Sequence, residues 1–248
     1  MKIYAVIPAR YASTRFPGKP LCLLCGKPMI QWTYERTACL RVLSDTLVAT
    51  DDTRIAQCVR NFGGKVVMTR SSIKTGTDRV AAALHGKHYD WVFNIQGDEP
   101  LINSGLLTAM VRKTAAITPP AIITAVRKIE HQDDLENQNV VKVVLTQDGR
   151  ALYFSRASVP DTRRSKRSGS AVLYRHIGVY LFHRTALDRF IRRGATALEK
   201  VEQLEQLRAL EMGIPIYAVK TGYSPHGVDV PADVAVVERY IRRYVYKK

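Results

Sequence analysis

The chain opens with the stretch Lys2-Ile3-Tyr4-Ala5-Val6-Ile7-Pro8-Ala9-Arg10, which continues as Tyr11-Ala12-Ser13-Thr14-Arg15-Phe16-Pro17-Gly18-Lys19-Pro20. Its first part is apolar and branched, and it predicts a buried strand that stops at Pro8, because proline cannot donate to a central ladder. The loop that follows carries three cations, Arg10, Arg15 and Lys19. Such a loop can hold a polyphosphate, since arginine offers a planar fork of donors and lysine offers a point charge.

The two standard phosphate-binding motifs are absent from this loop. It contains no G-x-G-x-x-G, and Gly18-Lys19 is followed by Pro20 where a P-loop has serine or threonine. Ser13 stands where the first glycine of a P-loop belongs. The alternative that these cations form only a solvated basic loop therefore stays open.

The composition is that of an ordinary globular protein. Of the 248 residues, 46% are hydrophobic and 24% are charged, which suffices for one sizeable core and predicts a single domain. The formal net charge of +16 indicates an anionic partner: a nucleotide, a nucleic acid or a membrane surface. No charge-free apolar run is long enough to cross a bilayer, and no signal-peptide cleavage site follows the first strand. These features predict a cytoplasmic enzyme without membrane insertion.

The four cysteines include one C-x-x-C pair, Cys22 and Cys25. A zinc site normally needs two further ligands at matching spacing, and neither a second C-x-x-C nor an H-x-x-x-H occurs. The pair flanks two leucines, and cysteine in such surroundings behaves as a small hydrophobic residue. The pattern favours buried thiols over metal or redox chemistry.

Predicted strands and helices alternate through the first half of the chain. This alternation implies an α/β fold with a mostly parallel central sheet flanked by helices, and a smaller mixed lobe in the second half. Ligands of such sheets bind beyond the carboxyl ends of the strands, where the loops 8–20, 50–53, 75–79 and 96–100 can meet. The expected strands cover residues 47–50, 65–69 and 91–95, and the expected helices cover 26–41, 53–62 and 75–84.

The second half is less regular. Its polar segment from Asp161 to Ser170 holds a basic cluster over 163–167, which predicts a flexible loop or a lid. The turn Gln147-Asp148-Gly149-Arg150 predicts a hairpin. The other expected elements are strands over 140–146, 151–156, 174–182 and 214–220, a helix over 198–212 and a last helix from Pro231.

Two aspartates stand out as candidate metal ligands. Asp98 and Asp229 each follow a short strand and lie beside glycine and proline. Carboxylates on a rigid sheet edge are hard oxygen ligands suited to Mg²⁺. Because Asp229 lies two residues before Pro231, it can equally be the N-cap of the last helix.

An ordered set of further motifs carries a resemblance to a known family. The chain resembles the CMP-KDO synthetases, or 3-deoxy-manno-octulosonate cytidylyltransferases, nearly from end to end. The family places glutamate at Asp78 and threonine at Val230, and these two departures affect fine positioning only. The matching blocks are 8–21, 26–30, 48–51, 76–79, 94–100, 141–144, 151–156, 175–180, 204–208 and 227–229.

The resemblance implies a reaction and a set of roles. CMP passes from CTP to the anomeric hydroxyl of 3-deoxy-manno-octulosonate (KDO), which gives CMP-KDO and pyrophosphate and activates KDO for lipopolysaccharide synthesis. Such a transfer needs positioning and charge neutralisation more than covalent help. The implied nucleotide-side residues are Arg10, Arg15 and Lys19 on the β- and γ-phosphates, Ala49, Thr50, Asp51, Gly76 and Thr77 along the nucleoside, and Asp98 and Asp229 on Mg²⁺.

The same resemblance implies a sugar-acid site and a homodimer. Arg156 is the expected partner of the KDO carboxylate, because its fork of donors matches a carboxylate. His176 can instead be an ordinary hydrogen-bonded histidine, and Glu202 and Gln206 can lie on a solvated helix face. The nucleotide-binding half covers about 1–120, and the sugar-acid and dimerisation half covers about 121–248. The implied sugar-acid residues are Gln96, Arg156, His176, Tyr180, Glu202 and Gln206.

Two other functions remain as alternatives. One is a CMP-sialic acid synthetase or a related sugar nucleotidylyltransferase, against which the blocks 94–99 and 154–156 favour KDO. The other is a nucleic-acid-binding protein, which the net charge of +16 permits. Such a protein would interleave cations with exposed aromatic residues on one face, whereas the cations here are dispersed.

Overall fold

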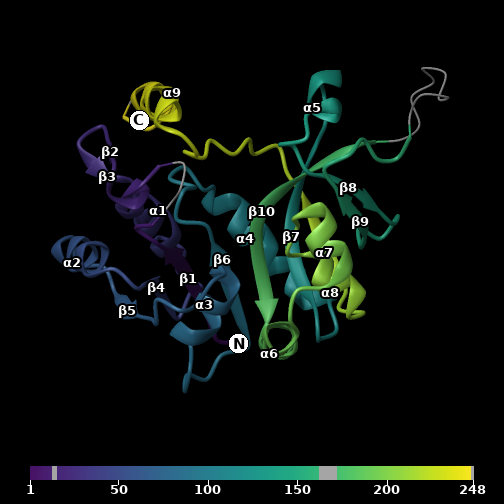
Figure 1. The fold of residues 1–248 in the computed structure, drawn as a ribbon, viewed down its shortest axis with the longest axis horizontal. Helices are drawn as coiled ribbons and strands as arrows, with labels where there is room; N and C mark the ends of the chain where they lie inside the picture. The colour runs from purple at the N-terminus through teal and green to yellow at the C-terminus, as the bar shows by residue number, and fades with distance from the viewer. Residues whose placement is uncertain (13–15, 162–171, 247–248) are drawn as a thin grey trace. The chain divides into compact units, whose positions relative to one another are not determined.

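The computed structural model describes residues 1–12, 16–161 and 172–246 (Figure 1). The chain divides into two compact units, one formed by Met1–Ser104 with Pro225–Lys248 and the other by Gly105–Ser224. The last segment thus groups with the N-terminal unit, whereas the sequence analysis assigns it to a second half that begins near residue 121. Whether the two units act as a single domain stays a prediction.

The N-terminal unit is built on four parallel strands in the order β6-β1-β4-β5. Six of the seven residues of β1 are buried, as the apolar opening predicts. Pro8 does not end the strand, which runs one residue further to Ala9. The strands are β1 (Ile3–Ala9), β4 (Asp45–Thr50), β5 (Val66–Met68) and β6 (Trp91–Ile95).

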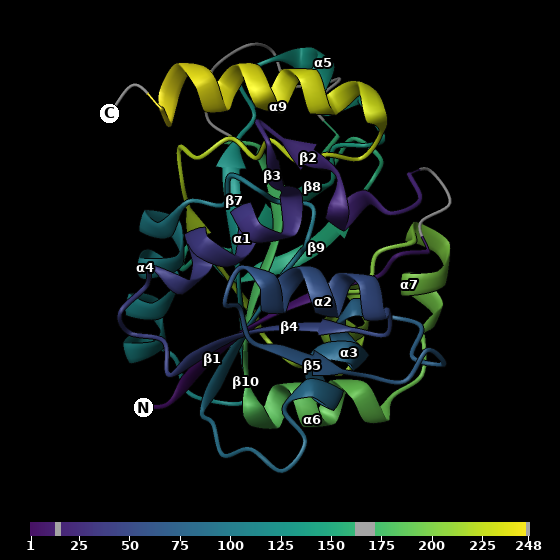
Figure 2. The same cartoon turned by 90° about the vertical axis from the view of Figure 1, so that its left-hand side faces the viewer.

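Helices cover both faces of this sheet. Along the chain, β4 lies next to β1 and β5 next to β4, and the chain then returns to place β6 on the other side of β1. Because the crossovers are right-handed, the first two helices lie on one face of the sheet and the third helix lies on the other. Figure 2 shows the first two helices in front of the sheet. Between β6 and β1 the strand order reverses, and the carboxyl ends of strands at such a point are where ligands bind. The three helices are α1 (Met29–Ala38), α2 (Thr53–Asn61) and α3 (Gly76–Ala83).

Local sequence explains where these helices begin. Asp52 caps α2 by accepting a hydrogen bond from the backbone N of Arg54 at 2.9 Å, and the Thr75 hydroxyl caps α3 through the N of Asp78 at 3.0 Å. Helix α1 begins later than predicted, because residues 27–28 pair with 23–24 in a small hairpin. The hairpin strands are β2 (Leu23–Leu24) and β3 (Lys27–Pro28), after the 3₁₀ helix η1 (Lys19–Leu21).

The last helix, α9 (Pro231–Tyr244), belongs to the same unit and begins at Pro231 as predicted. Val237 and Ile241 on α9 are buried in one cluster with Leu24 and Trp32. The Trp32 indole Nε1 donates to the carbonyl oxygen of Leu24 at 2.9 Å, which satisfies its polar group within the cluster. Cys22 and Cys25 pack half-buried against this cluster, in keeping with the predicted apolar role of the pair.

The second unit holds a mixed sheet. Strand β7 pairs antiparallel with β10 and parallel with β11, and β8 pairs antiparallel with both β9 and β10. The predicted hairpin around 147–150 is therefore confirmed. The strands are β7 (Ile122–Lys128), β8 (Lys142–Leu145), β9 (Ala151–Ser155), β10 (Tyr174–His183) and β11 (Ile216–Lys220); the helices are α4 (Ser104–Lys113), η2 (Thr114–Ala116), α5 (Gln132–Glu136), α6 (Arg184–Arg192), α7 (Ala197–Glu202) and α8 (Leu207–Glu211).

The prediction of one helix over 198–212 is wrong. Gln203 adopts a left-handed conformation with φ of 54°, which ends α7 after Glu202, and α8 starts only at Leu207. The apolar spacing misleads here because only α8 buries its residues, among them Leu207 and Ala209, while α7 buries none. Glu202 and Gln206 consequently do not lie one turn apart on a common helix.

The fold class, α/β with a mostly parallel sheet, is confirmed. Among the described helices, none is long and apolar enough to span a membrane. The basic cluster at 163–167 lies outside the residues that the structure describes.

Candidate active site

A cavity of about 200 Å³ opens at the carboxyl edge of the N-terminal sheet. It lies where the strand order reverses, so the topology and the cavity agree on the place of a ligand. Gly97 permits this close packing, because a Cβ there would lie only 3.1 Å from the backbone oxygen of Pro8. The lining includes Pro8, Ala9, Arg10, Ala12, Lys19, Pro20, Met29, Gly76, Arg79, Gln96, Gly97 and Asp98.

Lys19 joins the two aspartates that the sequence singles out. Its Nζ lies 2.6 Å from Oδ2 of Asp98 and 3.4 Å from Oδ1 of Asp229. The lysine side chain is 14% exposed, and those of Asp98 and Asp229 are 33% and 62% exposed. The structure thus brings together two carboxylates that lie far apart in the sequence.

Backbone contacts hold the loop that carries Asp229. The backbone N of Val228 donates to the carbonyl oxygen of Asp98 at 3.1 Å, and Val228 is fully buried. The carboxylate of Asp233 accepts hydrogen bonds from the backbone N of Asp229 at 2.7 Å and of Val230 at 2.9 Å. Asp233 therefore caps α9, and the carboxylate of Asp229 faces Lys19 instead of serving as the cap.

The loop after β1 is described except for residues 13–15, so Arg15 lies outside the described residues. Arg10 lines the cavity, is exposed, and donates from Nη1 to the carbonyl oxygen of Lys74 at 2.9 Å. Gly18 has φ of 72°, which glycine adopts readily, and its N donates to the oxygen of Tyr11 at 2.9 Å. This contact closes the loop and sets Lys19 at the start of η1.

The predicted nucleoside residues at the end of β4 are mostly interior. Ala49 and Thr50 are fully buried, and the Thr50 hydroxyl accepts from the backbone N of Asp52 at 3.2 Å. Asp51 forms an ion pair with Arg79, whose Nη2 lies 3.0 Å from Oδ2 of Asp51. Arg79 lines the cavity, so this pair connects Asp51 to the candidate site.

Gly76 and Thr77 differ in their relation to the cavity. Gly76 lines it, whereas Thr77 is buried and its hydroxyl accepts a hydrogen bond from the Asn94 amide at 3.1 Å. Gln96, predicted to contact the sugar acid, lines the same cavity as Arg10 and Lys19.

The remaining predicted sugar-acid residues belong to the second unit. Glu202 accepts hydrogen bonds from the Ser155 hydroxyl at 2.6 Å and from the backbone N of Arg156 at 2.9 Å. Burial raises the pKa of Glu202, but the hydrogen bonds from Ser155 and Arg156 lower it more, so its carboxyl titrates below the usual range. Glu202 is therefore a charged anchor for the end of β9.

Arg156 is held by backbone carbonyls. Its guanidinium donates to the carbonyl oxygen of Glu202 at 3.1 Å, of Gln138 at 3.1 Å and of Gln203 at 3.5 Å. Beneath it, the fully buried Lys142 donates to the carbonyl oxygen of Arg156 at 2.5 Å. Burial lowers the pKa of Lys142 below its usual range. The charge of Glu202 raises this pKa, and the charge of Arg156 lowers it.

His176 and Tyr180 lie side by side on β10, with ring centroids 5.4 Å apart. Burial lowers the pKa of His176 to about 3, so this side chain is neutral at physiological pH. Burial and the charge of Glu205 raise the pKa of Tyr180 above its usual range, so the phenol keeps its proton. Gln206 is 7% exposed and lies just before α8.

Three buried polar groups are not predicted from the sequence as site residues: Arg79, Thr124 and Lys142. Arg79 and Lys142 are fully buried cations, and Thr124 is a fully buried hydroxyl. The local pattern misleads for Lys142, because strand alternation places it opposite its neighbours Val141 and Val143, in the position that usually faces solvent. Nothing in the local sequence marks Thr124.

The acidic groups fit a divalent cation only as a pair. Among residues 1–12, 16–161 and 172–246, no group of three or more His, Cys, Asp or Glu side chains could hold a metal ion. Asp98 and Asp229 nevertheless share one ammonium, so a single cation can contact both carboxylates. Mg²⁺ often binds through one or two carboxylates together with water and substrate phosphates, so the donor set suits it.

Fold and cavity together define an α/β protein with a candidate ligand site at the switch point of its sheet. The sequence profile of the cytidylyltransferase family matches residues 4–216. The chain belongs to this family, and within it to the 3-deoxy-manno-octulosonate cytidylyltransferases, as the following relatives show.

The relatives match along their whole length. The 3-deoxy-manno-octulosonate cytidylyltransferase of Geobacter metallireducens is 43% identical and covers 98% of this chain and 99% of its own. That of Geobacter sulfurreducens is 45% identical and covers 96% of this chain and 98% of its own. A solved CMP:2-keto-3-deoxy-manno-octonic acid synthetase in complex with CTP has 36% identity and a TM-score of 0.92, and the match covers 98% of this chain and 99% of that chain.

Proposed function

We propose that this cytidylyltransferase moves CMP from CTP to the anomeric hydroxyl of KDO and releases pyrophosphate. The observation that carries the proposal is the cluster of Lys19, Asp98 and Asp229 at the cavity, in a chain that belongs to the KDO cytidylyltransferases. The relatives are named for this reaction, and the solved relative binds CTP. Cations and carboxylates at one sheet edge are what a transfer between a triphosphate and a hydroxyl needs.

Arg10 and Lys19 are the proposed phosphate ligands, with Arg15 as a third from the sequence. Arg10 and Lys19 line the cavity, and their charge would stabilise the pyrophosphate as it leaves. Gly76 and the Asp51–Arg79 pair would border the nucleotide. The buried side chains of Ala49, Thr50 and Thr77 would contribute through packing or backbone atoms.

Asp98 and Asp229 are the proposed ligands of Mg²⁺. When bound, the ion would neutralise phosphate charge and polarise the reacting oxygens. The two aspartates alone would repel a triphosphate, and Lys19 offsets one of their two charges. Because Lys19 also lines the cavity, its ammonium would add positive charge where the phosphates bind.

The sugar acid would bind among neutral and charged groups of the second unit, and the role of Gln96, which lines the cavity of the N-terminal unit, stays a prediction from the family resemblance. A neutral His176 and a protonated Tyr180 suit the hydroxyl groups of a sugar, because each can hydrogen-bond without a charge. Gln206 and Glu202 would add an amide and a carboxylate. The contacts of Arg156 to backbone carbonyls support a role in shaping this region, beside the proposed pairing with the KDO carboxylate.

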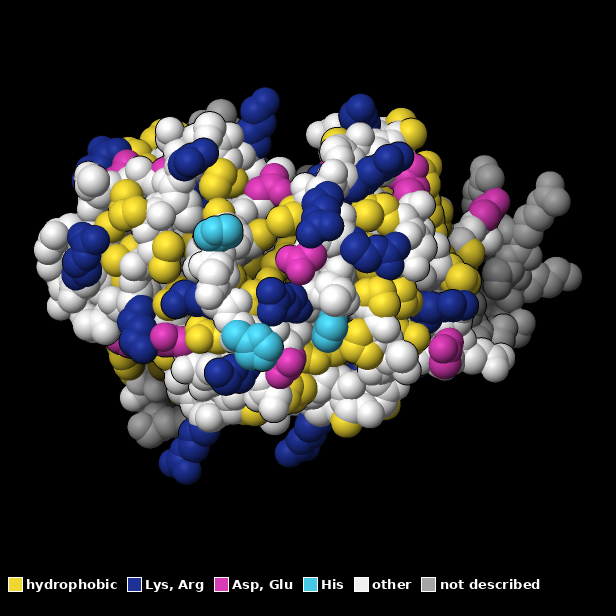
Figure 3. Space-filling model, turned by 90° about the horizontal axis from the view of Figure 1, so that it is seen from below, with side chains coloured by type: hydrophobic (Ala, Val, Ile, Leu, Met, Phe, Trp, Pro, Cys, Tyr) yellow, Lys and Arg dark blue, Asp and Glu magenta, His cyan; other side chains and the backbone are white. Residues whose placement is uncertain are grey.

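Homodimer formation is a further proposal that rests on the family resemblance, and cytoplasmic location is one that rests on the sequence pattern. The nucleic-acid alternative finds little support on the face shown in Figure 3, where Asp, Glu and His side chains lie among the Lys and Arg side chains and divide them. The sialic-acid alternative concerns the same cavity and is decided by substrate choice.

The decisive experiment measures pyrophosphate release by the purified protein with CTP, Mg²⁺ and KDO. Parallel reactions replace KDO with N-acetylneuraminic acid, and CTP with ATP, GTP or UTP. We expect release with CTP and KDO that far exceeds release with the other pairs, and CMP-KDO as the second product. Preference for N-acetylneuraminic acid, or no release with any pair, would refute the proposal.

A further inference from the structure

One buried hydroxyl in the second unit connects the two aromatic side chains proposed for the sugar-acid site. Thr124 on β7 is fully buried. Its Oγ1 lies 2.9 Å from Nε2 of His176, 2.9 Å from the carbonyl oxygen of Val179 and 3.3 Å from that of Ile177. All three partners lie on β10.

The single proton of this hydroxyl determines the tautomer of His176. Carbonyl oxygens only accept hydrogen bonds, so the Thr124 hydroxyl must donate toward Val179 or Ile177. Toward His176 the same oxygen is then an acceptor, and the ring must carry its hydrogen on Nε2. If Nε2 lacked the hydrogen and took the Thr124 proton, the Thr124 oxygen would face two carbonyl oxygens without a proton between them.

The neutral ring therefore presents a lone pair at Nδ1. Burial lowers the pKa of His176 to about 3, which leaves one proton on the ring at neutral pH. The ring is also fixed in direction, since it packs edge-on against Phe154 with centroids 5.1 Å apart. The backbone N of His176 donates to the oxygen of Val141 at 2.8 Å. Such a ring can accept a hydrogen bond from a sugar hydroxyl at Nδ1.

The same hydroxyl stabilises an irregularity in β10. His176 pairs with Val126 and Ile177 with Ala125, but the next pair is Tyr180 with Thr124, so Gly178 and Val179 are extra residues. Val126 and Thr124 are two positions apart on β7, so their side chains lie on the same face of the strand and their Cα atoms are roughly 7 Å apart. The bulge thus brings His176 and Tyr180, which are four residues apart, to the spacing of same-face neighbours.

We propose that Thr124 is a positioning residue of the sugar-acid site, which holds the β10 bulge closed and fixes His176 as the Nε2-protonated tautomer beside Tyr180. The kinetic part of this inference rests on the proposed function, whereas the structural part does not. Thr124 itself touches no reacting atom; it acts through His176 and through the carbonyl oxygen of Val179.

Nuclear magnetic resonance tests the structural part without substrate. Long-range ¹H–¹⁵N correlation spectra of the ¹⁵N-labelled protein distinguish the two tautomers, and a His176→Gln variant identifies the signals among the six histidines. We expect wild-type His176 as the Nε2–H tautomer. We expect a mixture of tautomers in Thr124→Val, which keeps the size but removes the hydroxyl, and the wild-type pattern in Thr124→Ser. A wild-type ring protonated at Nδ1, or an unchanged ring in Thr124→Val, would overturn the proposal.

Steady-state kinetics test the functional part. Thr124→Val should raise KM for KDO by about 10-fold, the factor that corresponds to one hydrogen bond, with KM for CTP unchanged and with rescue in Thr124→Ser. The matched control is Thr37→Val, since Thr37 is an equally buried threonine whose hydroxyl donates to the carbonyl oxygen of Thr33 at 2.8 Å on α1. Equal KM for KDO in Thr124→Val and the control, or no rescue by serine, would contradict the inference. If the wild-type protein does not use KDO at all, the proposed function fails, and the spectra still decide the role of Thr124.

Discussion

Replacing Asp51 with asparagine should cost stability, because Asp51 neutralises a fully buried cation. The Arg79 side chain is 0% exposed, and its Nη2 lies 3.0 Å from Oδ2 of Asp51, which is 15% exposed. The other partners of the guanidinium are the Thr69 hydroxyl and the carbonyl oxygen of Ile73. Both are neutral, so Asp51→Asn keeps the shape of the site but leaves Arg79 without the carboxylate of this ion pair.

The magnitude follows from the burial of the pair. Removing one partner of a buried ion pair costs about 3–5 kcal/mol. Because Asp51 is partly exposed to water, we expect the lower end of this energy range, so the free energy of unfolding should fall by about 3 kcal/mol. For a chain of this size such a loss lowers Tm by about 6–12 °C. In the double variant Asp51→Asn/Arg79→Met the buried charge is gone as well, and part of the stability should return.

The assay is urea and thermal unfolding followed by circular dichroism. The control is Asp134→Asn, because Asp134 pairs with Arg175 at 3.3 Å while both side chains remain about a third exposed, at 31% and 27%. Such a pair contributes less than about 1 kcal/mol. A loss in Asp51→Asn no larger than that of the control would refute the argument from burial. If CTP affinity then fell instead, Asp51 would act on the nucleoside directly.

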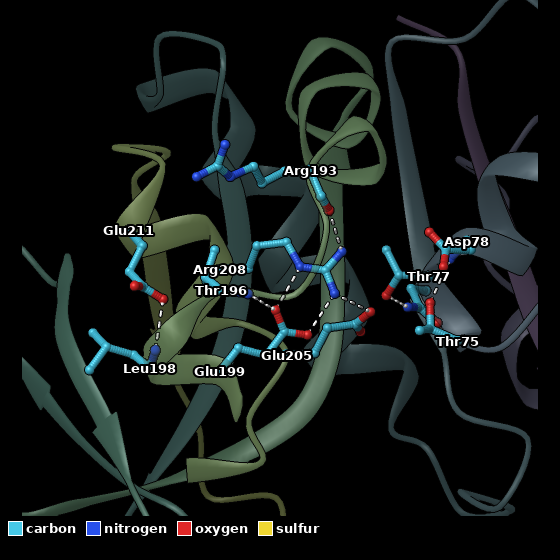
Figure 4. A network of polar contacts seen from close by, with 11 residues as sticks. Thr75, Thr77, Asp78, Arg193, Thr196, Leu198, Glu199, Glu205, Arg208 and Glu211 are labelled. Atoms are coloured by element: carbon cyan, nitrogen blue, oxygen red, sulfur yellow. Dashed lines mark hydrogen bonds and ion pairs between the residues drawn. The ribbon is translucent and has the colours of Figure 1, made fainter. Parts of the chain in front are cut away.

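Three further outcomes are expected. Asp98→Asn and Asp229→Asn should each abolish most turnover with the fold retained. The double variant should lose little more turnover than the worse single variant, because both aspartates would serve one cation. Multiplicative losses in the double variant, or full activity in excess EDTA, would count against this prediction. Arg156→Lys should raise KM for KDO and leave KM for CTP unchanged. It should also lower Tm, because lysine cannot reach the three carbonyl oxygens that the guanidinium contacts. An unchanged Tm would argue that these carbonyl contacts do not stabilise the fold. Burial raises the pKa of Glu199, but hydrogen bonds from Arg208 and the backbone of Thr196 lower it more (Figure 4). The charged Glu199 therefore stabilises the fold above the usual carboxyl pKa range, and this stabilisation is lost as the pH falls below that range. In acid unfolding experiments, the free energy of unfolding should depend less on pH in Glu199→Gln than in wild type.

Much of the N-terminal unit can be predicted from sequence because its signals are local. The buried strand Trp91–Ile95 is apolar except for Asn94, and the helix after β4 has a capping aspartate at Asp52. Each signal depends on residues within one or two turns of the element that it defines. Helix α1 is the exception, because its start depends on the pairing of residues 23–24 with 27–28. The proline at position 28 instead suggests the first turn of a helix.

The second unit resists prediction where long-range contacts override local preference. Apolar spacing over 198–212 fits a continuous helix, but Gln203 takes φ of 54° and divides it. The break leaves the carboxylate of Glu202 accepting from Ser155 and from the backbone of Arg156, more than forty residues earlier in the chain. No pattern within 198–212 contains that contact.

The candidate sites of the two units differ in the same way, and the difference has a physical origin. Lys19 and Asp98 come from loops after the parallel strands β1 and β6, and parallel topology sends such loops to one edge whatever the details of packing. Asp229 comes from the loop before α9, and Lys19 lies 2.6 Å from Asp98 and 3.4 Å from Asp229. Their joint role in holding a cation stays a prediction. His176 and Tyr180 are four residues apart, which a regular strand would separate by roughly 13 Å, so a regular strand predicts no contact. Their contact requires a bulge, and the bulge is satisfied by a hydroxyl fifty residues away, on Thr124. A site built from edge loops can thus be predicted from topology, whereas a site built on an irregular strand depends on one distant hydrogen-bonding group.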